Sequence, residues 1–442
     1  MRRIEFVYFD AGGGHRAAAT ALEMSVRSQN LPWDVHLLNF QELLDDLDIL
    51  KKYAGIRIQD FYNLMLRRGW TLGSKQLMNV LQTAIRAWHR PVVRALEKYW
   101  RESQPDMVVS FIPHFNRALG ESFARTFPGR PFVTVLTDIA DYPPHFWIER
   151  RSAVEGLPAV EGLPAVAGLP AAAGPSIGAA PSQYFVCGSE RAAVQARMMG
   201  HPADHIFRAS GMILHPRFYE PPVADRASER ARLGLRPDLP TAVVLFGGYG
   251  SEVMLEIAER LDRSPLELQL IFICGRNEKL ANELKARLSR EGLGGASRIP
   301  CFVEGFTSKV NYYMQLADFF IGKPGPGSIS EALAMHLPVI VECNAWTLPQ
   351  ERFNAEWVLE QEVGIVLRSF SEIEGAVAQL LASTTLARYR ANAAALRNRA
   401  VFEIPRMLDE ILSRAAASES LRRASSSASA RLNTDSQLFA KP

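Results

Sequence analysis

The sequence predicts an α/β protein built from two doubly wound domains. Short runs of β-branched and aromatic residues alternate with amphipathic segments along most of the chain. This alternation is typical of parallel sheets that are covered on both faces by helices. The 442 residues exceed what one typical core contains, and a proline-rich junction divides the strand-like runs into two series.

The two series define the expected domains. The first comprises the runs IEFVYF, WDVHLLNF, DMVVSFI, PFVTVLTD and QYFVCGS, and the second comprises TAVVLFGG, LQLIFICG, CFVEGF, DFFIGK and LPVIVECN. Between them, ILHPRFYEPPVADR has three prolines and no apolar period, which is typical of a linker. We therefore expect a first domain over residues 1–215 and a second over residues 216–412, which includes closing helices.

Two segments are expected to lie outside both domains. Residues 151–182 contain the tandem hexads AVEGLP, AVEGLP and AVAGLP, which are too few and too small to stack into a solenoid and indicate a flexible inserted loop. Residues 415–442 lack the apolar side chains needed to pack, so we predict a disordered tail there.

Composition excludes several classes of protein. With 50 Lys and Arg against 47 Asp and Glu, the net charge of +3 gives no indication of nucleic-acid binding. The four cysteines form no C-x-x-C pair and indicate thiols in a reducing compartment. Glu5 interrupts a first apolar run that leads into glycines, which favours a strand over a signal peptide, and no apolar run reaches the length of a membrane span. We expect a cytoplasmic location.

Basic charge is concentrated in residues 51–101. This window holds eleven Lys or Arg against two acidic residues, together with seven aromatic residues. Such a mixture suits an anionic membrane surface, and it is also compatible with nucleic acid. The alternative is an ordinary solvated helix face whose aromatic residues lie partly in the core. We favour membrane contact.

The sharpest local signal is DFFIGKPGPGSISEALAMH, which predicts a strand, a turn and a helix. Gly325 and Gly327 leave the start of the helix unobstructed, and Ser328 is a favourable N-cap. Because a helix N-terminus attracts anions, we predict a phosphate site here that requires no metal. The alternative is a turn in which glycine and proline serve only the backbone.

Three further turns follow predicted strands of the same domain: CGRN, GFT and PQERFN. Ligands of open α/β sheets bind at the carboxyl ends of the strands, so these turns are expected to converge on one crevice. Several polar side chains there can hydrogen-bond to sugar hydroxyls: Asn277, Thr307, Glu331, Gln350, Glu351 and Asn354.

Together these segments resemble a known family of enzymes. The motifs GGGH, CGRNEKL, EGF, GKPGPGSISEALAMHLPVIV and PQERFNAEWV are similar to those of the family 28 glycosyltransferases that include monogalactosyldiacylglycerol synthase and MurG. The resemblance spans about residues 4–412 apart from the insert, and CGRN-x-KL and K-x-GPG-[ST]-I-x-EA are closer to the diacylglycerol glycosyltransferase branch. TLPQE places Pro349 where the family often has glycine, which leaves the identity of the sugar open.

The resemblance implies a GT-B architecture, in which two Rossmann-like domains face a cleft. The first would bind the acceptor and the second a UDP-sugar, with inversion and no bound metal. By motif, Glu331 would hold the ribose hydroxyls, the turn at Gly327 and Ser328 the diphosphate, and the backbone of Phe306 the uracil. Gln350, Glu351 and Asn354 would contact the donor sugar.

The opening segment FDAGGGHRAAA also satisfies the G-x-G-x-x-A pattern of dinucleotide binding. That fingerprint requires an acidic residue at the end of the second strand, where this chain has Asn39. Two alternatives remain, namely helix packing by the glycines and an acceptor loop that brings His15 to the cleft. We favour the second, whose loop residues are Gly12, Gly13 and Gly14.

Inverting transfer requires a base for the acceptor hydroxyl, and an imidazole suits this task near neutral pH. His15 is the first candidate, while Asp138 and Asp141 are candidates for the base or for orienting the histidine, against a purely structural role in a strand end and a turn. Asp46 and Asp48 form a D-x-D pattern within a predicted helix, which argues against a metal site. We expect neither a metal nor a cofactor.

The expected function is therefore inverting transfer of galactose or glucose from a UDP-sugar to diacylglycerol or a similar lipid. The enzyme would be peripheral, on the inner face of the membrane. One alternative is MurG-like transfer of N-acetylglucosamine to a polyprenyl-linked intermediate. Another is a non-catalytic protein that binds nucleotide sugars.

Overall fold

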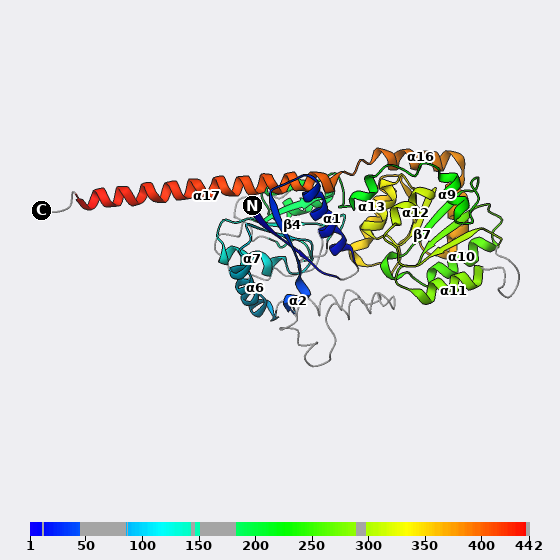
Figure 1. Cartoon of the computed structure of the whole chain (residues 1–442), viewed down its shortest axis with the longest axis horizontal. Helices are drawn as coiled ribbons and strands as arrows, with labels where there is room; N and C mark the ends of the chain where they lie inside the picture. Colours follow the sequence, from blue (N-terminus) through cyan, green and yellow to red (C-terminus); the bar gives the residue numbers. More distant parts are fainter. Residues whose placement is uncertain are drawn as a thin grey trace.

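The computed structural model describes residues 1–10, 13–44, 85, 87–142, 146–150, 183–288 and 298–438, with side chains described to residue 420. Within these ranges the chain forms two six-stranded parallel sheets, each flanked by helices (Figure 1). The predicted α/β architecture of two doubly wound domains is therefore confirmed. The hexads and residues 51–84 of the basic window lie outside the described residues.

The first sheet has the strand order β2-β1-β3-β4-β5-β6. Its strands are β1 (Arg2–Tyr8), β2 (Trp33–Asn39), β3 (Met107–Ser110), β4 (Phe132–Val135), β5 (Gln183–Cys187) and β6 (Ile206–Arg208). Helix α1 (Gly14–Ser28) packs on one face, and α2 (Phe40–Leu44), α6 (His89–Ser103) and α7 (Asn116–Thr126) pack on the other. Helix α8 (Glu190–Met198) follows β5. The central strands read as continuous apolar runs because helices bury both faces.

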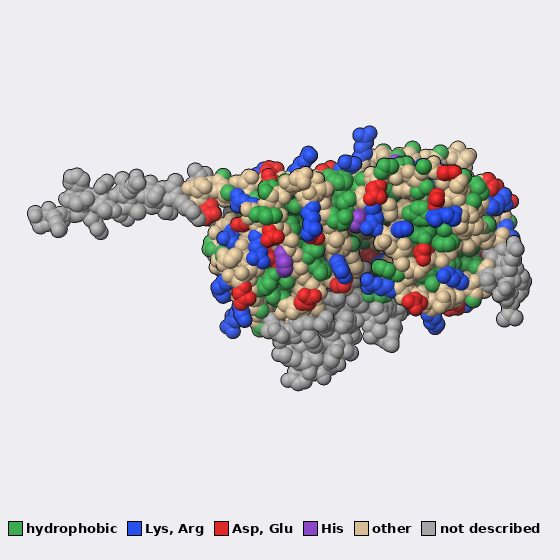
Figure 2. Space-filling view, viewed as in Figure 1, with side chains coloured by type: hydrophobic (Ala, Val, Ile, Leu, Met, Phe, Trp, Pro, Cys, Tyr) green, Lys and Arg blue, Asp and Glu red, His purple; other side chains and the backbone are tan. Residues whose placement is uncertain are grey.

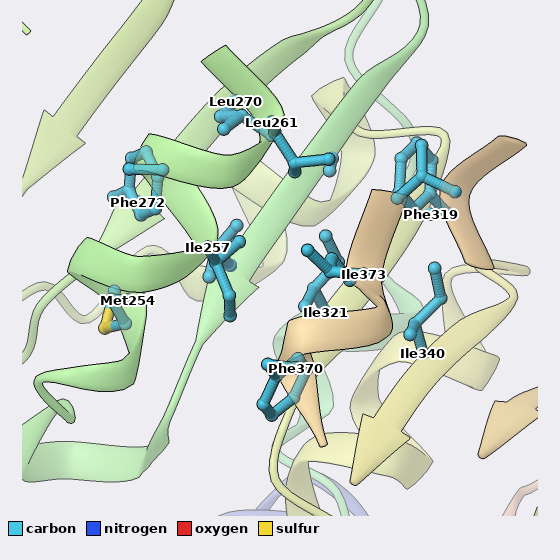
Figure 3. Close-up of a cluster of buried hydrophobic side chains, with 14 of the residues drawn as sticks. Met254, Ile257, Leu261, Leu270, Phe272, Phe319, Ile321, Ile340, Phe370 and Ile373 are labelled. Carbon is cyan, nitrogen blue, oxygen red and sulfur yellow. The ribbon is translucent and has the colours of Figure 1, made fainter. Parts of the chain in front are cut away.

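The second sheet has the order β12-β11-β10-β7-β8-β9. Its strands are β7 (Thr241–Leu245), β8 (Gln269–Ile273), β9 (Cys301–Glu304), β10 (Phe319–Gly322), β11 (Val339–Glu342) and β12 (Gly364–Leu367). On one face α10 (Val253–Arg263), α11 (Glu278–Leu288) and α15 (Ile373–Leu381) enclose the apolar cluster of Figure 3. The other face is covered by α12 (Val310–Leu316), α13 (Pro326–Ala334) and α14 (Arg352–Glu360). Short helices α9 (Arg226–Arg232) and α16 (Ser383–Ala395) complete this half.

The last helix, α17 (Ala400–Leu438), differs from expectation in two respects. Ala400, Ile404, Leu408 and Ile411 lie on one stripe and pack into the core of the first sheet beside α1, so residues 400–412 do not complete the second domain. In Figure 1 this helix lies across the first half and projects beyond it. The backbone also stays helical to Leu438, where we expected a disordered tail, because alanine, arginine and leucine favour helix even without an apolar stripe.

Helix α6 carries the described end of the basic window. Trp100 is fully buried and donates a hydrogen bond from Nε1 to Ser122 Oγ at 2.9 Å, so this aromatic residue belongs to the core rather than to a membrane surface. The opposite face of the helix exposes four cations at helical spacing: Arg90, Arg94, Lys98 and Arg101.

Candidate active site

The glycine loop near the start of the chain leads into α1. Gly13 has a left-handed backbone (φ 82°) as N-cap, which favours glycine, and Gly14 begins the helix. A side chain at Gly14 would meet no heavy atom within 4 Å, so the loop borders open space. Gly12 lies outside the described residues. The loop therefore leaves room beside His15, in the first turn of α1.

His15 is partly buried where strands of the first sheet end. Its Nδ1 lies 3.2 Å from Thr137 Oγ1, and its ring contacts the Trp147 ring edge-on with centroids 5.9 Å apart. Burial lowers the pKa of His15 to about 4, a shift that the Phe111 carbonyl only partly opposes. The imidazole is therefore neutral at pH 7 and can accept a proton.

Asp138 lies on the other side of Trp147, whose Nε1 donates to the Asp138 carboxylate at 2.8 Å. Burial raises the pKa of Asp138 to about 7, while the hydrogen bond from Trp147 opposes this rise. The charges of Glu351 and Lys323, both in the second domain, also act on this carboxyl, the first raising and the second lowering its pKa. Charged groups of the second domain therefore act on a carboxyl of the first. The molecular surface is hollowed where the two halves join (Figure 2).

Asp141 has a different environment from Asp138. Its two oxygens accept hydrogen bonds from Arg191 at 2.9 and 2.6 Å. The Arg191 guanidinium also lies 3.6 Å from Glu360 and stacks 4.3 Å above the Phe353 ring, both in α14 of the second domain. The Asp141 carboxylate is therefore engaged in a contact that bridges the domains rather than with His15.

The predicted anion site lies at the start of α13. The helix begins at Pro326 with Gly325 as N-cap, so Ser328 is its third residue and not the expected N-cap. Proline explains the earlier start, because its backbone is already suited to the first helical position. The amides of Gly327 and Ser328 have no carbonyl partner within the helix, and a Cβ at Gly327 would meet no atom within 4 Å. The site therefore retains free donors with open access.

Lys323 places a cation beside this helix start. Its Nζ donates to Glu351 Oε1 at 2.8 Å. A Cβ at Gly325 would lie 3.3 Å from Lys323 Cε, and one at Gly247 would lie 3.6 Å from the same atom. The position of Gly325 is therefore tight, and glycine there makes room for the lysine stem, whereas the distance at Gly247 is an ordinary contact.

Glu331 lies further along α13. Burial raises its pKa to about 7, and the charge of Arg217 opposes this rise. Within the turn after β9, Phe306 is 64% exposed, and the Arg276 guanidinium lies 5.0 Å above its ring.

Asn277 and Thr307 make local backbone contacts. Asn277 Oδ1 accepts from the Leu280 amide at the start of α11 at 3.0 Å, and Thr307 Oγ1 accepts from the Lys309 amide at 3.0 Å. Their side-chain oxygens therefore serve turn geometry in this structure.

Gln350, Glu351 and Asn354 are buried in the segment that follows β11. Asn354 Nδ2 donates to the Pro324 carbonyl at 2.8 Å, which ties α14 to the turn before α13. Among the described residues, Gln350 Oε1 and Asn354 Oδ1 have no hydrogen-bond partner. Buried acceptors without partners are costly, so these two oxygens are suited to accept from hydroxyl groups of a ligand.

Sequence reasoning does not find three residues of this site: Lys323, Trp147 and His114. A lysine directly before PGPG is a usable signal, because a cation at a strand end beside a helix N-terminus suits a phosphate. Trp147 and His114 have no such local signal, since contacts far along the chain bring them to the cleft.

The described ranges, with their gaps, contain neither a metal-ligand cluster nor a membrane-spanning helix. No group of three or more His, Cys, Asp or Glu that could hold a metal ion occurs in them, and Asp46 and Asp48 lie outside them. Independence of metals thus stays a prediction. The same part of the chain contains no helix that is both long and apolar enough to cross a bilayer.

Comparison with solved structures identifies the fold. The fold matches MurG from Acinetobacter baumannii with a TM-score of 0.53 and 13% identity, covering 93% of this chain and 100% of that one. It also matches the calicheamicin glycosyltransferase CalG4 with a TM-score of 0.53 and 16% identity, covering 94% and 99%. The architecture is that of the GT-B glycosyltransferases.

Sequence comparison identifies the glycosyltransferases that this chain resembles. Residues 242–399 match the glycosyltransferase family 28 C-terminal domain. The chain is 27% identical to the probable monogalactosyldiacylglycerol synthase 2 of Oryza sativa subsp. indica, covering 89% of this chain and 77% of the relative. It is 26% identical to the monogalactosyldiacylglycerol synthase of Spinacia oleracea, covering 93% and 73%. The resemblance to these family 28 glycosyltransferases is confirmed, and the expected class of enzyme, a UDP-sugar-dependent hexosyltransferase, is supported.

Trp147→Phe is expected to raise the pKa of Asp138 further, because the indole N–H stabilises the ionised carboxylate. The pKa of Asp138 in the folded state already exceeds its ordinary value of 3.8, so its contribution to stability is present below about pH 4 and lost as the pH rises through about 7. The variant should enlarge that loss by about 1–2 kcal/mol at pH 8.5 relative to pH 6.

Thermal unfolding at these two pH values would measure the effect in the wild-type and Asp138→Asn backgrounds. The extra loss of stability that Trp147→Phe causes at pH 8.5 relative to pH 6 should be absent in the Asp138→Asn background. An equal pH dependence in both backgrounds would contradict the assignment.

Proposed function

We propose that this chain transfers a hexose, galactose or glucose, from a UDP-sugar to diacylglycerol or a similar membrane lipid, with inversion at the anomeric carbon. The observation that carries the proposal is that Asp138, which Trp147 links to His15 in the first domain, lies within reach of the charges of Lys323 and Glu351 in the second. The printed names of the sequence relatives, monogalactosyldiacylglycerol synthases, favour a galactosyl donor and a diacylglycerol acceptor.

The donor occupies the second domain in this proposal. Its diphosphate binds the amides of Gly327 and Ser328 and the Lys323 ammonium, where positive charge stabilises the leaving group as the glycosidic bond breaks. The ribose hydroxyls donate to Glu331, and the uracil lies against the backbone of Phe306.

The hexose binds beside the diphosphate. The buried oxygens of Gln350 and Asn354 have no partner among the described residues, which supports a role in accepting bonds from sugar hydroxyls. Glu351 holds the Lys323 ammonium in place and adds a further acceptor.

His15 is the base in the proposed reaction. The acceptor hydroxyl oxygen bonds to the anomeric carbon, its proton passes to the neutral imidazole, and the bond to the diphosphate breaks with its electron pair left on the diphosphate. The carboxylate of Asp138, beyond Trp147, stabilises the imidazolium that forms. Lys323 and the start of α13 neutralise the leaving group, so the proposed reaction requires neither a metal nor a cofactor.

The enzyme acts at the cytoplasmic face of a membrane in this proposal, held at the surface by residues 51–101. The exposed cations of α6, from Arg90 to Arg101, support this placement, because anionic lipid attracts such a row.

Mass spectrometry of lipids from a host that expresses the chain would test the function directly. The expected product is a monohexosyl diacylglycerol that is absent from the empty-vector control. A parallel assay with liposomes would compare UDP-galactose, UDP-glucose and UDP-N-acetylglucosamine. Transfer of N-acetylglucosamine to a polyprenyl lipid, or donor binding without turnover on any lipid, would refute the proposal.

His15→Ala is expected to abolish transfer and leave UDP binding largely intact, because the imidazole acts on the acceptor side. Loss of a general base reduces turnover by roughly 100- to 10,000-fold. Initial rates with liposomes would measure turnover, and titration calorimetry would measure the affinity for UDP. Full turnover by His15→Ala would refute the assignment of the base.

Glu331 makes donor binding depend on pH. Since its pKa in the free protein is about 7, only about a tenth is ionised at pH 6 and about nine tenths at pH 8. The ribose hydroxyls bind the ionised form, so UDP-glucose should bind about tenfold more tightly at pH 8 than at pH 6.

Calorimetry would measure the dissociation constants of UDP-glucose at pH 6 and pH 8. Glu331→Gln should bind UDP-glucose more weakly than the wild type at pH 8, and its two dissociation constants should be nearly equal. UDP-glucose is the suitable probe because its diphosphate has no group that titrates near neutrality. A tenfold ratio retained by Glu331→Gln would assign the dependence to another group.

A further inference from the structure

His114 is a buried histidine near His15 for which the reaction above has no use. It lies in the segment FIPHF between β3 and α7, and its backbone has a left-handed conformation with φ 68°. Its Nδ1 is buried and has no hydrogen-bond partner among the described residues. Both features carry a cost in free energy, and costs of this kind concentrate at functional sites.

The loop around His114 is held rigidly. Asn116 Nδ2 donates to the carbonyls of Ile112 and Trp147, each at 3.0 Å, while Ser110 Oγ donates to Asn116 Oδ1 at 2.7 Å. The His114 amide donates to the Phe146 carbonyl at 2.5 Å, and the two rings meet edge-on with centroids 4.6 Å apart. The imidazole is therefore preorganised, and its unpaired nitrogen does not reflect a loosely placed side chain.

His114 lies close enough to His15 for the charge of one ring to affect the other. Burial lowers the pKa of His114 to about 4, so the ring is neutral at pH 7. A neutral imidazole has one nitrogen that donates and one that accepts. Next to the proposed base, the cleft thus holds a second ring with one unused hydrogen-bonding atom.

We propose that His114 positions the acceptor, by donating a hydrogen bond from Nδ1 to an ester carbonyl of the diacylglycerol beside the hydroxyl that reacts. The inference rests on the proposed function. Diacylglycerol has an acyl ester on the carbon next to its free hydroxyl, and a carbonyl oxygen is a good acceptor for an imidazole N–H. His15 then takes the proton while His114 fixes the orientation of the glycerol, which restricts the reacting hydroxyl to a productive geometry.

The test compares two acceptors that differ at the carbonyl. Dioctanoylglycerol carries two ester carbonyls, whereas the dioctylglycerol diether has the same chain length and free hydroxyl without them. For the wild type, kcat/KM should be about tenfold higher with the diester, which corresponds to one hydrogen bond of about 1.4 kcal/mol.

His114→Phe should lower kcat/KM with dioctanoylglycerol about tenfold, mainly through KM, and leave the diether rate nearly unchanged. His114→Asn is the matched control, since asparagine tolerates the left-handed backbone and carries an amide donor near the position of Nδ1. It should restore most of the preference for the diester. Retained diether turnover and retained UDP-glucose binding show that each variant is folded.

The outcomes separate the two proposals. If the wild type glycosylates neither lipid, the proposed function fails, and the inference about His114 fails with it. If the wild type works but does not discriminate between the acceptors, or if His114→Phe keeps the wild-type preference, only the inference is overturned. A loss of kcat on both lipids together with a shifted pH profile would assign His114 to proton transfer and would also overturn it.

Discussion

The interaction on which the site depends is the electrostatic coupling of Asp138 to the Lys323–Glu351 pair across the cleft. It exists because both sheets are parallel and place polar turns after strands at the same junction. Asp138 follows β4 of the first sheet, while Lys323 directly follows β10 of the second. Each half alone has an incomplete set of groups for the proposed reaction, since the proposed base lies in one half and the proposed anion site in the other.

Burial then sets the protonation states that the chemistry needs. The same desolvation lowers the pKa of His15 and raises that of Asp138, so at pH 7 the imidazole is neutral and the carboxyl is about half ionised. In the proposed reaction the Trp147 ring, which contacts His15 and donates to Asp138, lies between the imidazolium that forms and this carboxyl.

The sequence predicts this fold well wherever the signal is local, as for the strand DFFIGK and the glycine loop before His15. Prediction from the sequence fails where the structure depends on contacts between residues that are distant in the sequence. The stripe of α17 is visible in the sequence, but nothing local says that Ile404 and Leu408 return to the first sheet rather than cover the second. Trp147 lies between His15 and Asp138 only because the loop after β4 folds back onto α1. Ser328 is misassigned as a cap because Pro326 competes for the helix start.

The return of α17 also determines how the two halves are connected. The chain passes between them near Met212 and again near Asn398, and Asn398 Nδ2 donates to the Met212 carbonyl at 2.8 Å, so the two crossings lie side by side. The Arg191 contact with Asp141 and Glu360 also bridges the halves, but these side chains are about 40–45% exposed, and such pairs contribute only about 0–1 kcal/mol. Phe353 and Trp357 of α14 also pack against apolar side chains of α8 and of the loop after β4, so buried apolar contacts as well as these pairs hold the two halves together. In the proposed reaction, a donor bound at α13 with its sugar at His15 would add contacts to both halves and would thereby stabilise this arrangement further.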